Sequence, residues 1–193
     1  IFVNPSTNKH SADLYRAYLK ENCVPKTYEA LKGFIDADGL TAHTIDHEYS
    51  HPVGCTPESS EALGGDVMKL LEEGKATMLG NLADEYQNDT PENRLRLVAR
   101  TVGRLLRFTH KETLGNPTSA PYVRENFVAI TTLVESGVMA LTEKGIVGNI
   151  EKAQSRVWFE HLKKFCVGVI SAYQAHNKNN IRQLTQQYCD QNK

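Results

Sequence analysis

The stretch YVRENFVAITTLVESGVMALT, residues 122–142, decides the fold class that we predict for this chain of 193 residues. Its only charged side chains are Arg124, Glu125 and Glu135. A helix that is apolar on most of its sides belongs at the centre of a helical bundle, where neighbouring helices surround it. We therefore predict that this segment is a central helix.

The segments around this stretch also predict helices. Residues 150–173 carry apolar side chains at helical spacing, after a turn at Gly145 and Gly148. Proline in the first turn, often followed by an acidic residue, indicates further helix starts at Pro25, Pro57 and Pro91. The remaining expected helices cover about residues 11–22, 25–35, 57–71, 75–87, 91–112 and 180–189. No run of alternating strand residues is expected.

These patterns predict an all-α, single-domain irregular helical bundle of about six to eight helices. Residues 122–142 and 150–173 are expected to form its centre. At this length the chain can bury a core of its own. The single domain is expected to cover residues 1–193, either as a whole protein or as a fragment of a longer one.

Composition limits the classes of function. No apolar run approaches the roughly 20 residues that a transmembrane helix needs, so we expect a soluble protein without a transmembrane segment. The formal net charge of -1 gives no overall attraction to nucleic acid, which is not expected as a partner. The four cysteines form no C-x-x-C pair, and reduced, structural thiols are expected. This slightly favours a reducing compartment.

Residues 41–56, TAHTIDHEYSHPVGCT, gather most of the side chains that could carry chemistry. His43, His47, His51 and Cys55 recur at every fourth position. On a helix, residues with this spacing share one face, and imidazole and thiolate are ligands that zinc prefers. One hypothesis is therefore a zinc site formed by these four residues.

The surroundings of the histidines favour a different local structure. Gly39, Pro52 and Gly54 bound the segment, which predicts a long connection between helices rather than one continuous helix. The histidines would then converge only if the connection folds back. In that case Asp46 and Glu48 could serve as further ligands, as groups that orient the histidines or as a general base, and His47, His51 and Glu48 are the candidate catalytic residues of a metal-dependent hydrolase.

A metal-free hydrolase is the other chemical interpretation of the same histidines. Two of them could act as acid and base on a phosphoester, while Lys32 or an arginine holds the phosphate. Phosphoesterase-like chemistry, with or without a metal, is therefore one class of function that we keep.

A basic ridge is the second candidate site. On a helix that begins at Pro91, five cations fall within an arc of about 80°. They are Arg96, Arg100, Arg104, Arg107 and Lys111. Such a ridge can be a solvated face paired with acids of neighbouring helices, or it can bind an acidic protein surface or a phosphate-bearing ligand. The preferred prediction is a helical interaction or regulatory module that uses this ridge, with the hydrolase as the alternative.

The start of the chain carries one resemblance. IFVNPSTNKH, followed by YLKENCVPKTYEALKGFI, resembles the opening of Ras-type GTPase-activating helical domains over about the first 35 residues. Val3 stands where that family has its arginine finger, and Leu105-Leu106-Arg107-Phe108 lacks the asparagine-proline that follows the family's F-L-R-F signature. The resemblance implies a GTPase-binding module without catalytic assistance.

Overall fold

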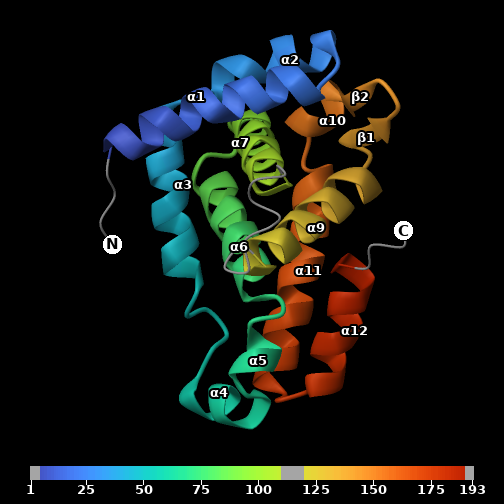
Figure 1. The fold of residues 1–193 in the computed structure, drawn as a ribbon. Helices are drawn as coiled ribbons and strands as arrows, with labels where there is room; N and C mark the ends of the chain where they lie inside the picture. The colour runs from blue at the N-terminus through green and yellow to red at the C-terminus, as the bar shows by residue number, and fades with distance from the viewer. Residues whose placement is uncertain (1–4, 110–119, 190–193) are drawn as a thin grey trace.

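The protein is described here by a computed structural model that covers residues 5–109 and 120–189. Within these ranges it has eleven α-helices, one short 3-10 helix and a two-stranded antiparallel sheet (Figure 1). The helical fold class is confirmed, but the predicted number of six to eight helices is wrong. Along the described residues, no helix is both long enough and apolar enough to cross a membrane.

The helix count is higher because several expected helices are divided. One expected helix breaks at Gly64, and residues 150–173 break at Ser155, whose extended backbone separates two helices. Gly74, where a break was expected, lies inside a continuous helix. The helices are α1 (Pro5–Asn22), α2 (Pro25–Leu31), η1 (Lys32–Phe34), α3 (Ala37–Ser50), α4 (Pro57–Leu63), α5 (Gly65–Met68), α6 (Glu72–Gln87), α7 (Pro91–Thr109), α9 (Ala120–Glu135), α10 (Ile150–Gln154), α11 (Val157–Gln174) and α12 (Lys178–Cys189).

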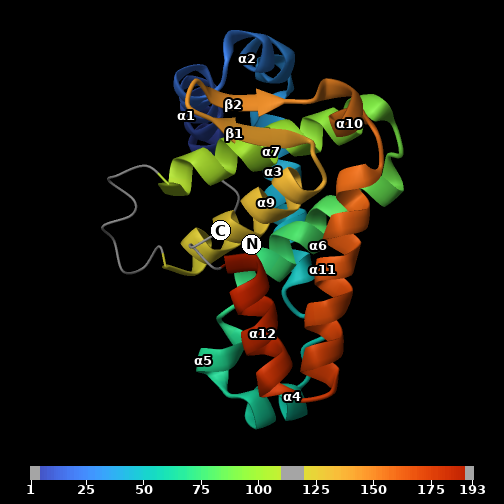
Figure 2. The ribbon, with the colours of Figure 1, turned by 90° about the vertical axis from the view of Figure 1, so that its right-hand side faces the viewer.

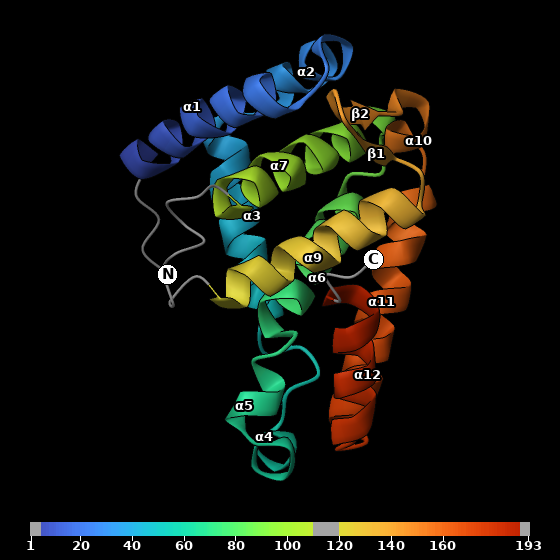
Figure 3. The ribbon, with the colours of Figure 1, turned by 45° about the vertical axis from the view of Figure 1, so that its right-hand side comes forward.

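Helix α6 occupies the middle of the molecule. It packs against α3, α9 and α11, while α1 and α2 lie across the outer side of α7 (Figures 1 and 3). The predicted central segments are thus the two neighbours α9 and α11 rather than the centre itself. Fully buried side chains of α6 and α11 fill the space between the helices, among them Met78, Trp158, Phe165 and Tyr173. The opposite end of the molecule is formed by α4, α5 and the lower part of α12 (Figure 2).

Helix α3 corrects the expectation for the histidine segment. Residues 37–50 form one continuous helix rather than a connection. Asp36 starts it as the N-cap, since its side chain accepts a hydrogen bond from the backbone N–H of Gly39 at 2.7 Å. Gly39, which was expected to bound a connection, therefore lies in the first turn of this helix. Pro52 and Gly54 lie beyond its end, so they do not interrupt it.

Gly80 allows α3 and α6 to approach each other closely. A Cβ atom at this position would lie 3.1 Å from the backbone nitrogen of His47 and 3.1 Å from the carbonyl carbon of Asp46. Such distances are shorter than ordinary carbon contacts, so glycine is needed where the two backbones meet. The close approach sets the first turns of α6 beside the histidines of α3.

The β-hairpin corrects the expectation of a purely helical chain. Helix α9 ends at Glu135 because Gly137 turns the backbone with a φ of 68°. Strands β1 (Met139–Thr142) and β2 (Gly145–Gly148) then pair antiparallel, with Met139 opposite Gly148. Strand β2 also extends to the segment between α1 and α2, where the N–H of Val24 donates to the carbonyl of Ile146 at 3.0 Å. That tertiary contact supports the short hairpin (Figure 2).

All four cysteines are free thiols, and Cys166 is buried in the core. Burial raises the pKa of Cys166 to about 12. Between pH 9 and that value the unfolded thiol ionises while the folded one stays protonated, so stability is lost as the pH rises. We expect Cys166→Ala to reduce this alkaline loss by about 1.4 kcal/mol per pH unit. Urea unfolding at about pH 8 and about pH 10 measures the difference, and equal losses in both proteins would contradict the prediction.

Candidate functional site

Helix α3 itself brings His47 and His51 together. His47 lies in its last turn, and His51 continues the helical backbone as the C-cap residue. The two Nε2 atoms are 3.1 Å apart, and the ring centroids are 4.7 Å apart. We expected the histidines to converge only if a connection folded back. The helix brings them together without such a loop.

Hydrogen bonds fix the orientation of the His47 ring. Its Nδ1 lies 2.9 Å from the hydroxyl oxygen of Thr77, and that hydroxyl donates to a carboxylate oxygen of Glu125 at 2.8 Å. Because the one hydroxyl proton goes to Glu125, Thr77 must accept from Nδ1–H of His47. This assignment leaves a lone pair on His47 Nε2.

A second set of contacts orients the His51 ring in the same sense. Its Nδ1 lies 3.2 Å from Oε1 of Glu72, which can only accept as a carboxylate. Glu72 is held in turn by the ammonium group of the fully buried Lys75 at 3.1 Å and by the hydroxyl of Tyr173, which donates at 3.1 Å. The lone pair of His51 is therefore also on Nε2, which faces His47.

Glu73 supplies a third acceptor atom. Its buried Oε2 lies 3.3 Å from His47 Nε2 but makes no hydrogen bond within the described part of the chain. His47 Nε2 thus lies close to two other atoms with lone pairs, His51 Nε2 and Glu73 Oε2, without a donor between them.

The two distances from His47 Nε2 to these neighbouring atoms suit a metal ion. Two ligands about 2.0–2.1 Å from one tetrahedral zinc ion lie about 3.3 Å apart. The distances of 3.1 Å between His47 and His51 and 3.3 Å between His47 and Glu73 are close to that value. Ligand atoms of His47, Glu48 and His51 also lie within 4.8 Å of one another. Nitrogen and oxygen donors of this kind fit zinc.

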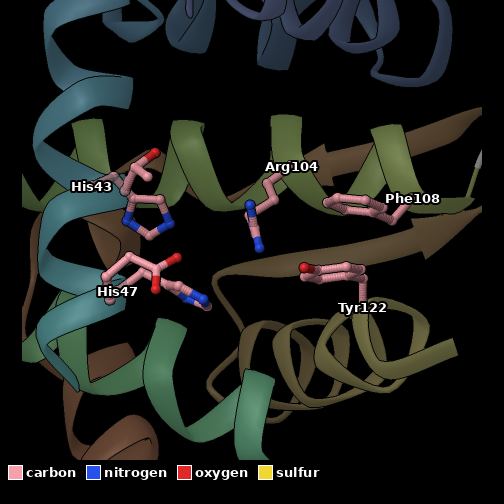
Figure 4. Close-up of a pocket in the computed structure, with 7 residues that line it drawn as sticks. His43, His47, Arg104, Phe108 and Tyr122 are labelled. Atoms are coloured by element: carbon pink, nitrogen blue, oxygen red, sulfur yellow. The ribbon is translucent and has the colours of Figure 1, made fainter. Parts of the chain in front are cut away.

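Glu48 lies beside this centre on the exposed side of α3. Together with His47 it lines a pocket of about 210 Å³ between α3, α7 and α9. The other lining residues are His43, Thr44, Arg104, Phe108 and Tyr122 (Figure 4). A carboxylate that is open to a pocket next to a metal position can take up a proton from water.

His43 and Cys55, the other two residues of the predicted fourfold set, lie elsewhere. His43 is buried in the pocket wall and is not part of the cluster around His47. The Sγ atom of Cys55 lies 3.4 Å from the Lys75 ammonium and 3.8 Å from Oε2 of Glu72. Cys55 therefore contacts the groups that hold Glu72, whereas Glu73 takes the third position near the histidine nitrogens.

The same stretch contains a shorter and more specific motif, which was missed when the residues at every fourth position were considered. Residues 47–51, His-Glu-Tyr-Ser-His, have the form H-E-x-x-H. On a helix this motif places two histidines on one face for a zinc ion, with the glutamate as general base. The acidic pair Glu72 and Glu73, in the first turn of the next long helix, was missed as well. No local sequence pattern marks Thr77 or Glu125 as part of the site.

The predicted basic ridge does not form a continuous exposed face. Arg100 is buried, where it donates to the carbonyl of Gly39 at 2.5 Å and to Asp84 at 2.8 Å. Arg104 binds the buried Glu125 through two hydrogen bonds of 2.5 and 3.0 Å. Arg96 is half-buried and Arg107 donates to Ser11, while Lys111 lies outside the described residues. Within the described residues, neighbouring helices thus bury Arg100 and partly cover Arg96, Arg104 and Arg107.

Comparison with known proteins shows the fold. No family model matches the sequence, and no curated protein does. A solved structure of DPP III from Caldithrix abyssi has a similar fold, with a TM-score of 0.70 and 18% sequence identity. The match covers 95% of this chain and 35% of that chain. This chain thus spans about a third of the length of its structural neighbour.

Proposed function

We propose that this chain carries the metal centre of a zinc-dependent hydrolase that acts on peptides. His47, His51 and Glu73 are the proposed ligands, and Glu48 is the proposed general base. The observation that carries the proposal is the convergence of two histidine Nε2 atoms and a buried carboxylate oxygen, with spacings of 3.1 and 3.3 Å and no donor among them. A cation would satisfy all three lone pairs.

The surrounding contacts support this assignment. Ligand histidines usually donate their other ring nitrogen to a carboxylate, a carbonyl or water. Here His51 donates directly to Glu72, and His47 reaches Glu125 through Thr77. Both histidines therefore have the outer contacts expected of ligands, and each leads to a different buried ion pair. Burying the two lone pairs without a partner would raise the free energy of the folded protein.

Peptide hydrolysis is favoured over the phosphoester chemistry considered from the sequence. The motif H-E-x-x-H on a helix is typical of metalloproteases, in which the glutamate acts as general base. The similar fold of DPP III along nearly the whole of this chain is the second support. Lys32, a candidate phosphate-binding residue, forms an exposed ion pair with Glu29 at 2.6 Å, which does not favour the phosphoester interpretation.

The residues would share the reaction as follows. A bound zinc ion would supply Lewis-acid chemistry toward the peptide carbonyl and toward a water molecule. Glu48 would accept a proton from that water and deliver it to the leaving amine. His47 and His51 would hold their positions because Thr77 and Glu72 fix their rings.

The alternative of an interaction module has weaker support. It required an exposed row of cations, but Arg100 and Arg104 are occupied by partners inside the protein. The geometry therefore favours the hydrolase, which was the alternative prediction from the sequence.

The proposal is tested by metal binding. Protein purified without an affinity tag should bind about one equivalent of zinc. His47→Ala and His51→Ala should each abolish binding, and Glu73→Gln should weaken it by at least the 10- to 100-fold that loss of an outer contact costs. Elemental analysis and competition with a chromogenic chelator measure stoichiometry and affinity.

Two variants serve as matched controls because they remove the other members of the fourfold set. His43→Gln and Cys55→Ala should retain zinc at nearly the affinity of the unmodified protein. Loss of zinc from Cys55→Ala with retention in Glu73→Gln would support the ligand set based on spacing instead. Absence of any stoichiometric metal would refute the proposed centre.

A further inference from the structure

The pocket beside the proposed metal centre has two different walls. Phe108 and Tyr122 form one wall as a stacked pair, with ring centroids 4.8 Å apart and an angle of 15° between the rings. His43 lies on the opposite side, and the Arg104 guanidinium lies between them, 5.2 Å from the centroid of the Phe108 ring and 5.7 Å from that of the Tyr122 ring (Figure 4). A pocket of about 210 Å³ with mixed walls suits one small amino-acid residue rather than a long segment.

Arg104 has a guanidinium edge that its internal ion pair does not use. Nε and Nη2 bind the two oxygens of Glu125. A guanidinium group has five N–H donors in a rigid plane, so it can hold a second carboxylate through its other edge. Figure 4 shows the guanidinium turned toward the space between His43 and Tyr122. Glu125 thus fixes Arg104 in a position from which it can bind a ligand.

His43 and Tyr122 add two further polar groups at the same place. Nε2 of His43 is buried and has no hydrogen-bond partner among the residues described, although the side chain lines the pocket and is only 5% exposed. Burial lowers the pKa of His43 well below its usual value, so the ring is neutral and can donate from Nε2. Burial also raises the pKa of Tyr122, which keeps its hydroxyl protonated as a donor.

We infer that this pocket binds a carboxylate group of the substrate, held by the free edge of Arg104, the Tyr122 hydroxyl and Nε2 of His43. The inference rests on the proposed peptide hydrolysis, because it places the carboxylate about one residue from the bond that is cleaved. The carboxylate can come from a free C-terminus or from an Asp or Glu side chain. Glu48 lines the pocket too, so the ligand carboxylate belongs at the Arg104 side, away from Glu48.

The test measures binding separately from hydrolysis. N-acetylglycine and N-acetylglycinamide differ only in the carboxylate, and their binding to the zinc-supplemented protein can be followed by NMR titration. We expect the acid to bind about tenfold or more tightly than the amide, since a hydrogen bond to a charged group has about that effect. Tyr122→Phe keeps the ring stack but removes the donor, so it should remove most of this preference. His43→Gln should also reduce it.

Substrate pairs identify the source of the carboxylate. Peptides with a free C-terminus are compared with their C-terminal amides, and amidated peptides with an internal Asp or Glu form the third arm. Faster hydrolysis of the free acids alone assigns the pocket to the C-terminus, and faster hydrolysis of the third arm assigns it to a side chain.

Three results would overturn the inference. They are equal binding of acid and amide, an acid preference that Tyr122→Phe and His43→Gln leave unchanged, and equal hydrolysis across all three peptide arms. The second result would mean that the metal alone holds the carboxylate. Failure of the proposed function looks different, because the protein would then bind no zinc while the preference for N-acetylglycine and its loss in Tyr122→Phe persist.

Discussion

Glu48→Gln should lower the rate of peptide hydrolysis by about 10²- to 10⁴-fold, the usual contribution of a general base. Glutamine keeps the size of the side chain and its exposed position on α3, but its amide cannot accept a proton at neutral pH. The loss should appear in kcat, because Glu48 acts on the attacking water rather than on substrate binding. Steady-state kinetics with an unstructured peptide measure the change.

Two comparisons make this result specific. Glu48→Gln should still bind zinc, because His47, His51 and Glu73 remain, so a loss of rate together with a loss of zinc would instead make Glu48 a ligand. Glu61→Gln changes an exposed glutamate on α4 that belongs neither to the cluster around His47 nor to the pocket, and it should hydrolyse the peptide at the unmodified rate. Full activity in Glu48→Gln would exclude the role of general base.

Local signals predicted those parts of the fold that depend on neighbouring residues. Thr56 and Pro57 start α4, where Thr56 and Ser59 form a reciprocal capping box, and Pro91 starts α7. Asp36 was harder, because an aspartate followed by Asp38-Gly39 fits a turn as well as an N-cap. Only the packing of α3 against α6 decides between these alternatives.

Long-range contacts explain the elements that the sequence did not predict. The hairpin depends on a hydrogen bond between Val24 and Ile146, which are far apart in the chain. Arg96, Arg100, Arg104 and Arg107 lie on α7, but helical periodicity does not say which helices cover them. Helix α7 packs against both α1 and α9, so Arg100 is buried and Arg104 is half-buried, although both were expected on the surface.

The candidate site divides in the same way. His47, Glu48 and His51 could be predicted from the H-E-x-x-H motif, which lies within five residues. The interpretation of the sequence nevertheless overlooked this motif and took the segment to lack it. Glu73 and Thr77 come from α6 and Glu125 from α9, so their places depend on how three helices pack. No local pattern identifies them.

Arg104→Met should lower the free energy of unfolding by about 3–5 kcal/mol, because it leaves Glu125 buried without its ionic partner. Glu125 is only 2% exposed, and it would keep only the hydrogen bond from Thr77. Burial alone would lower the pKa of Arg104, but the charge of Glu125 raises it above its usual value, which shows how closely the two groups are coupled. Urea unfolding at neutral pH measures the loss.

The double variant Arg104→Met with Glu125→Leu separates the ion pair from simple loss of packing. Replacing both charges removes the stranded carboxylate, so the double variant should be more stable than Arg104→Met alone. Lys32→Met, which breaks the exposed pair with Glu29, should leave the unfolding midpoint unchanged. Additive losses in the double variant would mean that Arg104 and Glu125 contribute independently. The hydrogen bond from Thr77 to Glu125 would then not depend on Arg104. The ring of His47, which contacts Thr77, would keep its orientation without the ion pair between Arg104 and Glu125.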